Sequence, residues 1–472
     1  MAIDKITASG LGDGGVSTAD IADGSITTAK IADNAVTDAK ATITVSPAAV
    51  SDTANTSAGA FDIPSGTTAQ RPGSPSSGYT RFNTDLGVME NYDGSAWLKV
   101  SAAPAVLGSV TGNIVNTAAN SLTLSGTGFL SSSLVVSFTP SGGSATNVTV
   151  TPSNDTAATV TVPSAIYGQS AGVVIGVKVT NSDGQSSTII NKTVVAMPSG
   201  GTIATSGNYR YHQFDSSANF VSTLALTVDY LIVAGGGGGG NATGSNWGAG
   251  GGGGAGGLLG GQSSLTVQTY GVVVGAGGAG GTQGAADNSG SNGQNSTFNS
   301  LTAIGGGKGG NANYDGSSGG SGGGGGYNTR TGGAGTSGQG NAGGNSQQNA
   351  GGGGGGKAGV GVSPANNSAP GGNGGAGSTS YSTWATATSS GVSGGYAGGG
   401  GGSRYGGGTV GTGTHGGGNA GASNSGANGS AATANTGGGG GAGGNGSTSG
   451  GSGGGGNGGS GIVIIRYNTT TL

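Results

Sequence analysis

The sequence predicts an all-β, elongated, multidomain protein, and three observations point to that class. Short Val-, Ile- and Thr-rich segments alternate with turn-forming residues between residues 61 and 200. Glycine makes up 119 of the 472 residues and is concentrated in the C-terminal half. Val/Ile-rich segments bracket this glycine-rich region. We therefore expect four parts: an N-terminal stalk (1–45), a small β-meander (46–103), an immunoglobulin-like sandwich (104–198) and a glycine-rich tip domain (199–472).

The composition excludes several classes of function. The net charge is −3 and only 7% of residues are charged, so we expect no nucleic-acid partner. The chain has no cysteine, which rules out disulfides and thiolate metal sites. Its two histidines have no clustered acids beside them, so we expect no metal, no cofactor and no catalytic residues; the chain is predicted not to be an enzyme. The N-terminus lacks a Sec-type signal pattern, which favours a protein that is made in a cytoplasm and released by lysis.

The stalk is predicted from three ten-residue repeats at residues 11–40. Positions one and six of each repeat are apolar: Leu11, Val16, Ile21, Ile26, Ile31 and Val36. A spacing of five fits neither a helix nor a strand, and two apolar side chains per ten residues cannot form a core within one chain. Three chains wound around one axis could bury them together, which predicts a homotrimer. The alternative is a flexible linker.

The meander is predicted from three strand-like pieces at residues 78–83, 88–92 and 96–100, separated by turn signals. Trp97 is expected to anchor a very small core. For Arg71 and Glu90 we favour a structural role over a role in binding. The sequence GTTAQRP, followed by an Arg-Phe-Asn-Thr strand and a Tyr-Asp-Gly…Trp hairpin, resembles a module common in phage tail fibres and related virion proteins.

The sandwich is predicted from seven alternating segments with turns at regular spacing. They span residues 105–110, 121–125, 134–139, 146–151, 158–162, 172–180 and 187–194. The stretch LTLSGTGFLSSSLVVSF resembles the first hairpin of the immunoglobulin-like IPT/TIG family. This resemblance implies a spacer, or a weak carbohydrate contact, and we favour the spacer.

The glycine-rich region begins after residues 222–234 (STLALTVDYLIVA) and ends at residues 461–467 (GIVIIRY), and we expect these two strands to pair. Residues 265–277 and 296–304 should extend a β base. Glycine tracts without a collagen triplet can form polyproline-II helices, which stack closely and hydrogen-bond laterally because glycine has no side chain. The alternative is low-complexity disorder.

The two bracketing motifs, DYLIVAGGGGGG and GGSGIVIIRY, resemble those of glycine-rich C-terminal domains in marine, cyanophage-like phage fibre proteins. The arrangement also resembles the polyglycine-II sandwich of receptor-binding adhesins from T-even-like phages. The resemblance implies recognition of a host surface by the loops between glycine runs. This chain departs from the adhesin pattern because its tip would be fused to its own stalk.

Aromatic and basic residues between the glycine runs are the candidate receptor contacts, because aromatic rings stack on sugar faces and polar groups form hydrogen bonds with sugar hydroxyls. They are Tyr314, Tyr327, Arg330, Tyr381, Trp384, Tyr396, Arg404, Tyr405 and His415. The alternative is that each ring merely covers the glycine lattice. His212, in YRYHQFD, is expected to be a surface strand residue, and His415 to lie in an exposed loop.

Together these expectations describe a tail fibre of a virion, exposed to the extracellular medium, that binds the host cell. Its partners would be copies of itself, other virion proteins through the N-terminus, and a host carbohydrate, lipopolysaccharide or outer-membrane protein. The alternative is a capsid or neck decoration fibre with only weak general adhesion. A secreted ice-binding or biofilm protein is a third candidate, but it should carry an export signal and regular threonine arrays, and we find neither.

Overall fold

The computed structural model describes residues 63–100, 104–129, 133–182, 184–242, 248–283, 290–311, 314–446 and 451–472. The chain divides into two compact units, residues 1–100 and 101–472, and each is described by itself. The all-β class is confirmed, since the described residues form many strands and only two short α-helices. The six predicted stalk positions, Leu11, Val16, Ile21, Ile26, Ile31 and Val36, lie outside the described residues, so the trimeric stalk stays a prediction.

The meander contains four strands in the order β1-β2-β3-β4. They are β1 (Ser65–Gly66), β2 (Thr80–Asn83), β3 (Val88–Tyr92) and β4 (Trp97–Lys99). An ion network occupies its covered face: Glu90 is 1% exposed and pairs with Arg71 at 2.5 Å and Arg81 at 3.5 Å. The Arg71 guanidinium lies over the half-buried Trp97 ring, 5.9 Å from its centre. A buried carboxylate with its two arginines therefore organises this unit together with the tryptophan.

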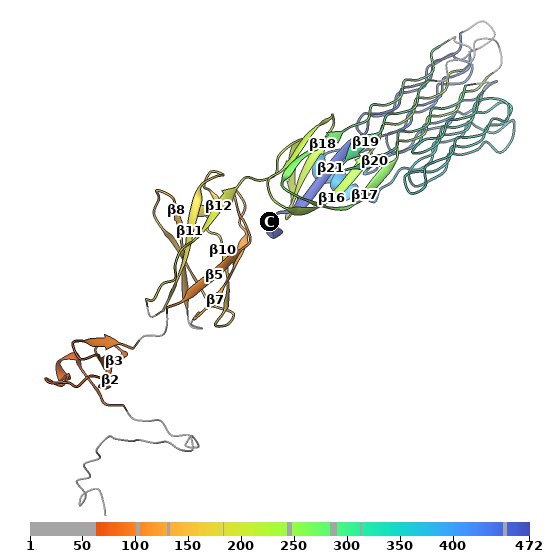
Figure 1. Cartoon of the computed structure of the whole chain (residues 1–472). Helices are drawn as coiled ribbons and strands as arrows, with labels where there is room; N and C mark the ends of the chain where they lie inside the picture. Colours follow the sequence, from red (N-terminus) through yellow and green to blue (C-terminus); the bar gives the residue numbers. More distant parts are fainter. Residues whose placement is uncertain are drawn as a thin grey trace, which may run out of the picture. The chain divides into compact units, whose positions relative to one another are not determined.

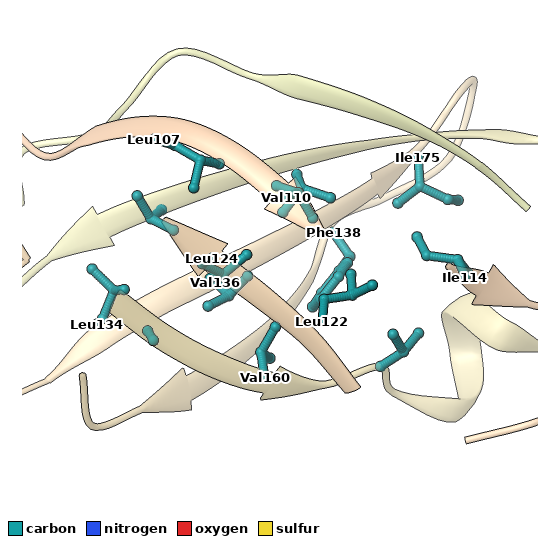
Figure 2. Close-up of a cluster of buried hydrophobic side chains, with 14 of the residues drawn as sticks. Leu107, Val110, Ile114, Leu122, Leu124, Leu134, Val136, Phe138, Val160 and Ile175 are labelled. Carbon is teal, nitrogen blue, oxygen red and sulfur yellow. The ribbon is translucent and has the colours of Figure 1, made fainter. Parts of the chain in front are cut away.

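The predicted sandwich is present, with all seven predicted strands. One sheet has the order β10-β7-β5 and the other β6-β12-β11-β8-β9. The strands are β5 (Val106–Thr111), β6 (Ile114–Val115), β7 (Ser121–Thr127), β8 (Leu134–Pro140), β9 (Thr146–Val150), β10 (Ala157–Thr161), β11 (Val174–Asn181) and β12 (Ile190–Val195). Inward-facing aliphatic side chains and Phe138 from both sheets fill the core (Figure 2). The sequence did not predict β6 or helix α1 (Ser164–Tyr167), which are too short for a periodic signal.

The glycine-rich part stands on a base of two sheets, ordered β13-β14-β21-β16-β17 and β15-β18-β19-β20. The strands are β13 (Thr202–Ser206), β14 (Tyr209–Phe214), β15 (Ala218–Ser222), β16 (Leu226–Val233), β17 (Leu258–Leu265), β18 (Gln268–Val273), β19 (Ser296–Phe298), β20 (Leu301–Ala303) and β21 (Ile462–Asn468). The predicted pairing of the bracketing strands is confirmed, because β16 and β21 are antiparallel neighbours from Asp229↔Arg466 to Val233↔Ile462. Residues 296–304 form a hairpin, not one strand, because Asn299 and Ser300 adopt positive φ angles of 45° and 63°.

The expectation that His212 lies on the surface is wrong. Its side chain is 0% exposed, because β14 lies inside the five-stranded sheet and this face packs against the second sheet. Phe220 contacts the ring edge-on, Tyr467 stacks on it, and Nδ1 lies 2.7 Å from the carbonyl oxygen of Gly200. Burial lowers the pKa of His212 to about 4.

The opposite face of the five-stranded sheet is covered by helix α2 (Ser382–Thr388). The sequence predicted a contact loop here, and the structure corrects this. Trp384 and Ala385 of the helix pack among Leu231, Ile464 and Tyr211, and the helix ends at Ser389 in a left-handed conformation. Neither described α-helix has the length to span a bilayer, since they contain four and seven residues.

Candidate functional site

The glycine tract at residues 235–240 shows how the C-terminal half is built. Its N–H groups donate to three neighbouring tracts in turn, and the partner repeats every third residue. The donor–acceptor pairs are Gly235 to Gln294, Gly236 to Gly459, Gly237 to Gly254, Gly238 to Ser291, Gly239 to Gly456 and Gly240 to Gly251. Three residues per turn with lateral bonds is the geometry of polyproline-II helices packed side by side.

The carbonyl groups of the same tract complete the packing. They accept from three further tracts, at residues 306 and 309, 278 and 281, and 440 and 443. The donor-side neighbours run antiparallel to the tract and the acceptor-side neighbours run parallel. The tract therefore has six neighbours, and all these bonds measure 2.8–3.0 Å. The predicted lateral bonding of glycine tracts is confirmed, and Figure 1 shows the tracts extending side by side from the β base.

Glycine is required at many interior positions of this lattice because the tracts approach backbone to backbone. A Cβ atom added at Gly236 would overlap the carbonyl group of Gly438, and one at Gly239 would overlap that of Gly441. Such separations are far below any van der Waals contact, so a side chain at either position would force two tracts apart.

Side-chain oxygens satisfy backbone N–H groups at the edges of the lattice. Asn, Ser and Asp residues on one tract accept from the next tract. In the following pairs, the side-chain oxygen of the first residue accepts the backbone N–H of the second: Asn292 and Lys308, Asn345 and Gly332, Asn373 and Thr412, Asn419 and Gly413, Asn428 and Gly454, Asn457 and Gly280, Ser291 and Ala279, and Asp315 and Thr331. Many of the polar residues that interrupt the glycine runs therefore have a structural role.

Successive tracts reverse direction, so the connections between them fall alternately at two ends of the lattice. The bonding directions assign turns near residues 319–321, 336–339, 357–358, 378–396, 415–416 and 433–436 to the end beside the β sheets. We call the opposite end the tip. Its described connections are residues 314–315, 327–330, 346–349, 363–370, 403–408 and 423–426.

Five of the nine predicted contact residues lie at the tip: Tyr314, Tyr327, Arg330, Arg404 and Tyr405. Tyr314 is 46% exposed, and Tyr327 and Tyr405 meet edge-on with ring centres 6.3 Å apart. Burial raises the pKa of the Tyr327 hydroxyl. The tip therefore brings tyrosines from connections about 80 residues apart in the chain onto one surface.

Contacts between neighbouring connections hold the tip in shape. The Arg404 guanidinium donates to the carbonyl groups of Gly407 and Ala369, so it clamps two connections together. The backbone of Arg330 exchanges hydrogen bonds with Ser346. Two exposed amides that the sequence did not single out, Gln348 and Asn367, form a reciprocal pair. Their only sequence signal is their place in a polar break between glycine runs.

The other four candidates, Tyr381, Trp384, Tyr396 and His415, lie at the base end. Trp384 is 5% exposed and Tyr396 is 0% exposed, so neither ring is an exposed receptor contact; this corrects the prediction. They are buried because they fill the space between the end of the lattice and the sheet. His415 is half-buried, not fully exposed, and its Nδ1 accepts the N–H of Gly377. For this end, the alternative that rings cover the lattice is the better description.

Among the described residues, no group of three acidic or histidine side chains is placed to hold a metal ion. Residues 213–468 match the model of a family described as a glycine-rich domain. No curated protein matches the chain. The match begins at the end of β14 and ends in β21, so it covers the whole lattice and the base strands from β15 to β21. Because it spans more than half of the 472 residues, the chain belongs to the glycine-rich domain family.

Proposed function

We propose that this protein is a structural fibre of a bacteriophage virion, and that the tip of its glycine lattice binds the surface of the host cell. The observation that carries the proposal is the tip itself, where tyrosines and amides gather on connections held by a rigid scaffold. The meander and the sandwich act as spacers in this proposal. The N-terminal repeats trimerise the fibre and attach it to other virion proteins.

The chemistry of the tip supports a carbohydrate-containing receptor. Tyr314 offers an exposed ring, and Asn328, Gln348, Asn366 and Asn367 offer exposed groups that both donate and accept hydrogen bonds. Rings that stack on sugar faces, beside amides that bond to hydroxyls, form a surface suited to glycans. The lateral bonds of the lattice keep these groups in place, so binding needs little ordering of the protein.

Binding, not catalysis, is the activity that we propose. Of the two histidines, His212 is enclosed by rings and His415 is bonded to the backbone. General acid–base chemistry needs a titratable group within reach of a substrate, and the enclosed His212 ring does not meet this requirement.

Competition of virus adsorption by the purified full-length protein tests the proposal. Cells that the virus infects are saturated with the protein, and the fraction of unadsorbed virus is measured. We expect strong inhibition by the native chain and loss of inhibition by the double variant Tyr327→Ala/Tyr405→Ala. Val360→Ala is the matched control, because Val360 is 63% exposed but lies on the side of the lattice near the base.

Absence of inhibition at saturating protein would remove the receptor-binding claim and favour a decoration fibre on the capsid or neck. Equal inhibition by the double variant would place binding outside the tyrosine surface. Labelling of the chain on intact particles, followed by electron microscopy, would separate attachment to the tail from attachment to the head.

A further inference from the structure

A hollow of about 350 Å³ lies at the base end of the glycine-rich part, away from the tip. Its floor comes from β16, β17 and β21, and its wall from the start of α2. The side chains that matter for its chemistry are Asp229, Gln262, Tyr381, Trp384 and Arg466. This volume is at the small end of the range for ligand sites, which corresponds to a ligand of about one ring.

Two consecutive glycines in the edge strand β17 let tyrosines approach the strand closely, one on each face of the sheet. The Tyr381 hydroxyl lies directly over Gly260 on the α2 face, where any Cβ would overlap it, and the Tyr230 hydroxyl lies over Gly261 on the face toward the second sheet. Glycine inside a strand weakens the strand and often marks the close approach of another group. The lattice does not explain this pair, because β17 bonds to β16 and not to a glycine tract.

The polar groups on the floor are fixed in position before any ligand arrives. Asp229 accepts from Gln262 at 2.9 Å through Oδ1 and from Arg466 at 3.0 Å through Oδ2. The Arg466 guanidinium is held between the rings of Tyr209 and Trp384, with distances of 4.2 and 4.4 Å to their centres. The side chains of Arg466 and Asp229 remain 20% and 22% exposed.

Both charged groups keep capacity for further hydrogen bonds. A carboxylate has about four lone-pair sites and a guanidinium has five N–H donors. Asp229 uses one site on each oxygen, and Arg466 donates to Asp229 and to the Tyr211 hydroxyl. Because the two charges neutralise each other, the hollow has no preference for an anion or a cation. It offers acceptors and donors side by side, next to the half-buried Tyr381 ring.

We propose that this hollow binds one pyranose ring of a neutral sugar. The apolar face of the sugar packs on the Tyr381 ring, and adjacent hydroxyls bond to Asp229, Gln262 and Arg466. This site is separate from the tip, and it does not depend on whether the tip recognises a host. A ligand of one ring makes few contacts, so we expect a dissociation constant in the millimolar range.

Fluorescence of Trp384 in the full-length chain is the direct test. Trp97→Phe and Trp247→Phe leave Trp384 as the single tryptophan of the three in the sequence. Glucose, galactose and N-acetylglucosamine are each titrated to about 100 mM, well above a millimolar dissociation constant. At least one should give a saturable change in emission, together with a rise in the unfolding temperature.

Matched variants on β17 locate the binding. Gln262→Leu should weaken binding at least fivefold, because it removes the amide from the floor. Ser264→Leu, on the same strand and the same face but outside the hollow, should bind as the parent does. Absence of saturation with all three sugars, equal binding by Gln262→Leu, or binding of only charged sugars such as glucuronate or glucosamine would each overturn the proposal.

Discussion

Substitution of one interior glycine by alanine tests whether the lattice is the folded state of the C-terminal half. Gly239 lies in the central tract, and a methyl group there would overlap the carbonyl group of Gly441 on a parallel neighbour. The neighbour cannot turn away, because its own N–H and carbonyl groups bond to other tracts. The only relief is to separate the tracts at residues 235–240 and 437–444.

The cost follows from the bonds that this separation breaks. Two hydrogen bonds of 2.9 Å join these tracts, from Gly440 to Gly237 and from Gly443 to Gly240. A buried group left without its partner costs about 1–3 kcal/mol, so two broken bonds cost about 2–6 kcal/mol. Alanine returns about 0.4–1 kcal/mol by restricting the unfolded chain. The net loss is about 1–5.6 kcal/mol, which should lower the unfolding midpoint by about 2–20 °C in a domain of this size.

Gly271→Ala is the control, because a Cβ added at this glycine of β18 would meet no atom within 4 Å. Its midpoint should stay the same or rise slightly, since only the effect on the unfolded chain remains. Thermal unfolding of both full-length variants, followed by circular dichroism, measures the difference. Equal midpoints for Gly239→Ala and Gly271→Ala, or rapid deuterium uptake by the amides throughout residues 235–461, would refute the packed lattice.

Three further predictions concern other parts of the chain. Asn457→Ala removes the oxygen that accepts the N–H of Gly280, and should cost about 1 kcal/mol in denaturant unfolding. The pKa of His212 is lowered to about 4, so the unfolded chain binds more protons than the folded chain between that value and about 6.5. Stability should therefore fall by about 3 kcal/mol as the pH drops through this window, and His212→Gln should remove that dependence from pH-series unfolding curves. Glu90→Gln leaves Arg81 buried without its charged partner, and should unfold the meander, as seen by loss of Trp97 near-ultraviolet dichroism.

Much of the fold could be predicted because its signals are local. Alternating Val and Thr between turn-forming residues located the sandwich strands, and the bracketing runs at residues 222–234 and 461–467 located the central pair of the base. These local sequence signals failed for elements whose secondary structure is determined by packing against the rest of the protein. Strand β17 was missed because Gly260 and Gly261 hide it within the glycine-rich composition. Helix α2 was missed because Ser and Thr favour no helix, and it forms because Trp384 packs on the sheet.

The candidate site could be predicted only in part, because the side-chain types in the loops do not say at which end of the lattice a loop lies. Trp384 and Tyr405 both follow glycine runs, yet one is buried at the base and the other lies at the tip. The end at which a loop lies depends on how many times the chain has reversed direction since it left the base. Counting these reversals requires that the first and last residue of every tract be known. Asp315 and Asn345 read as loop residues but cap N–H groups at the edge of the lattice.

The lattice also determines where such a protein can change its sequence without losing its fold. Tightly packed interior positions such as Gly236 and Gly239 accept only glycine, edge positions need an acceptor for an N–H group, and the base end must fit the sheet and α2. The tip connections are less constrained, because the chain needs only to reverse direction there. Contacts between neighbouring connections, such as the hydrogen bonds of the Arg404 guanidinium, can be replaced by others. A scaffold with this division can vary the sequence of its tip while the bonds of the lattice stay the same. That property is what an adhesive fibre requires, and it follows from the approach of bare backbones and not from any particular receptor.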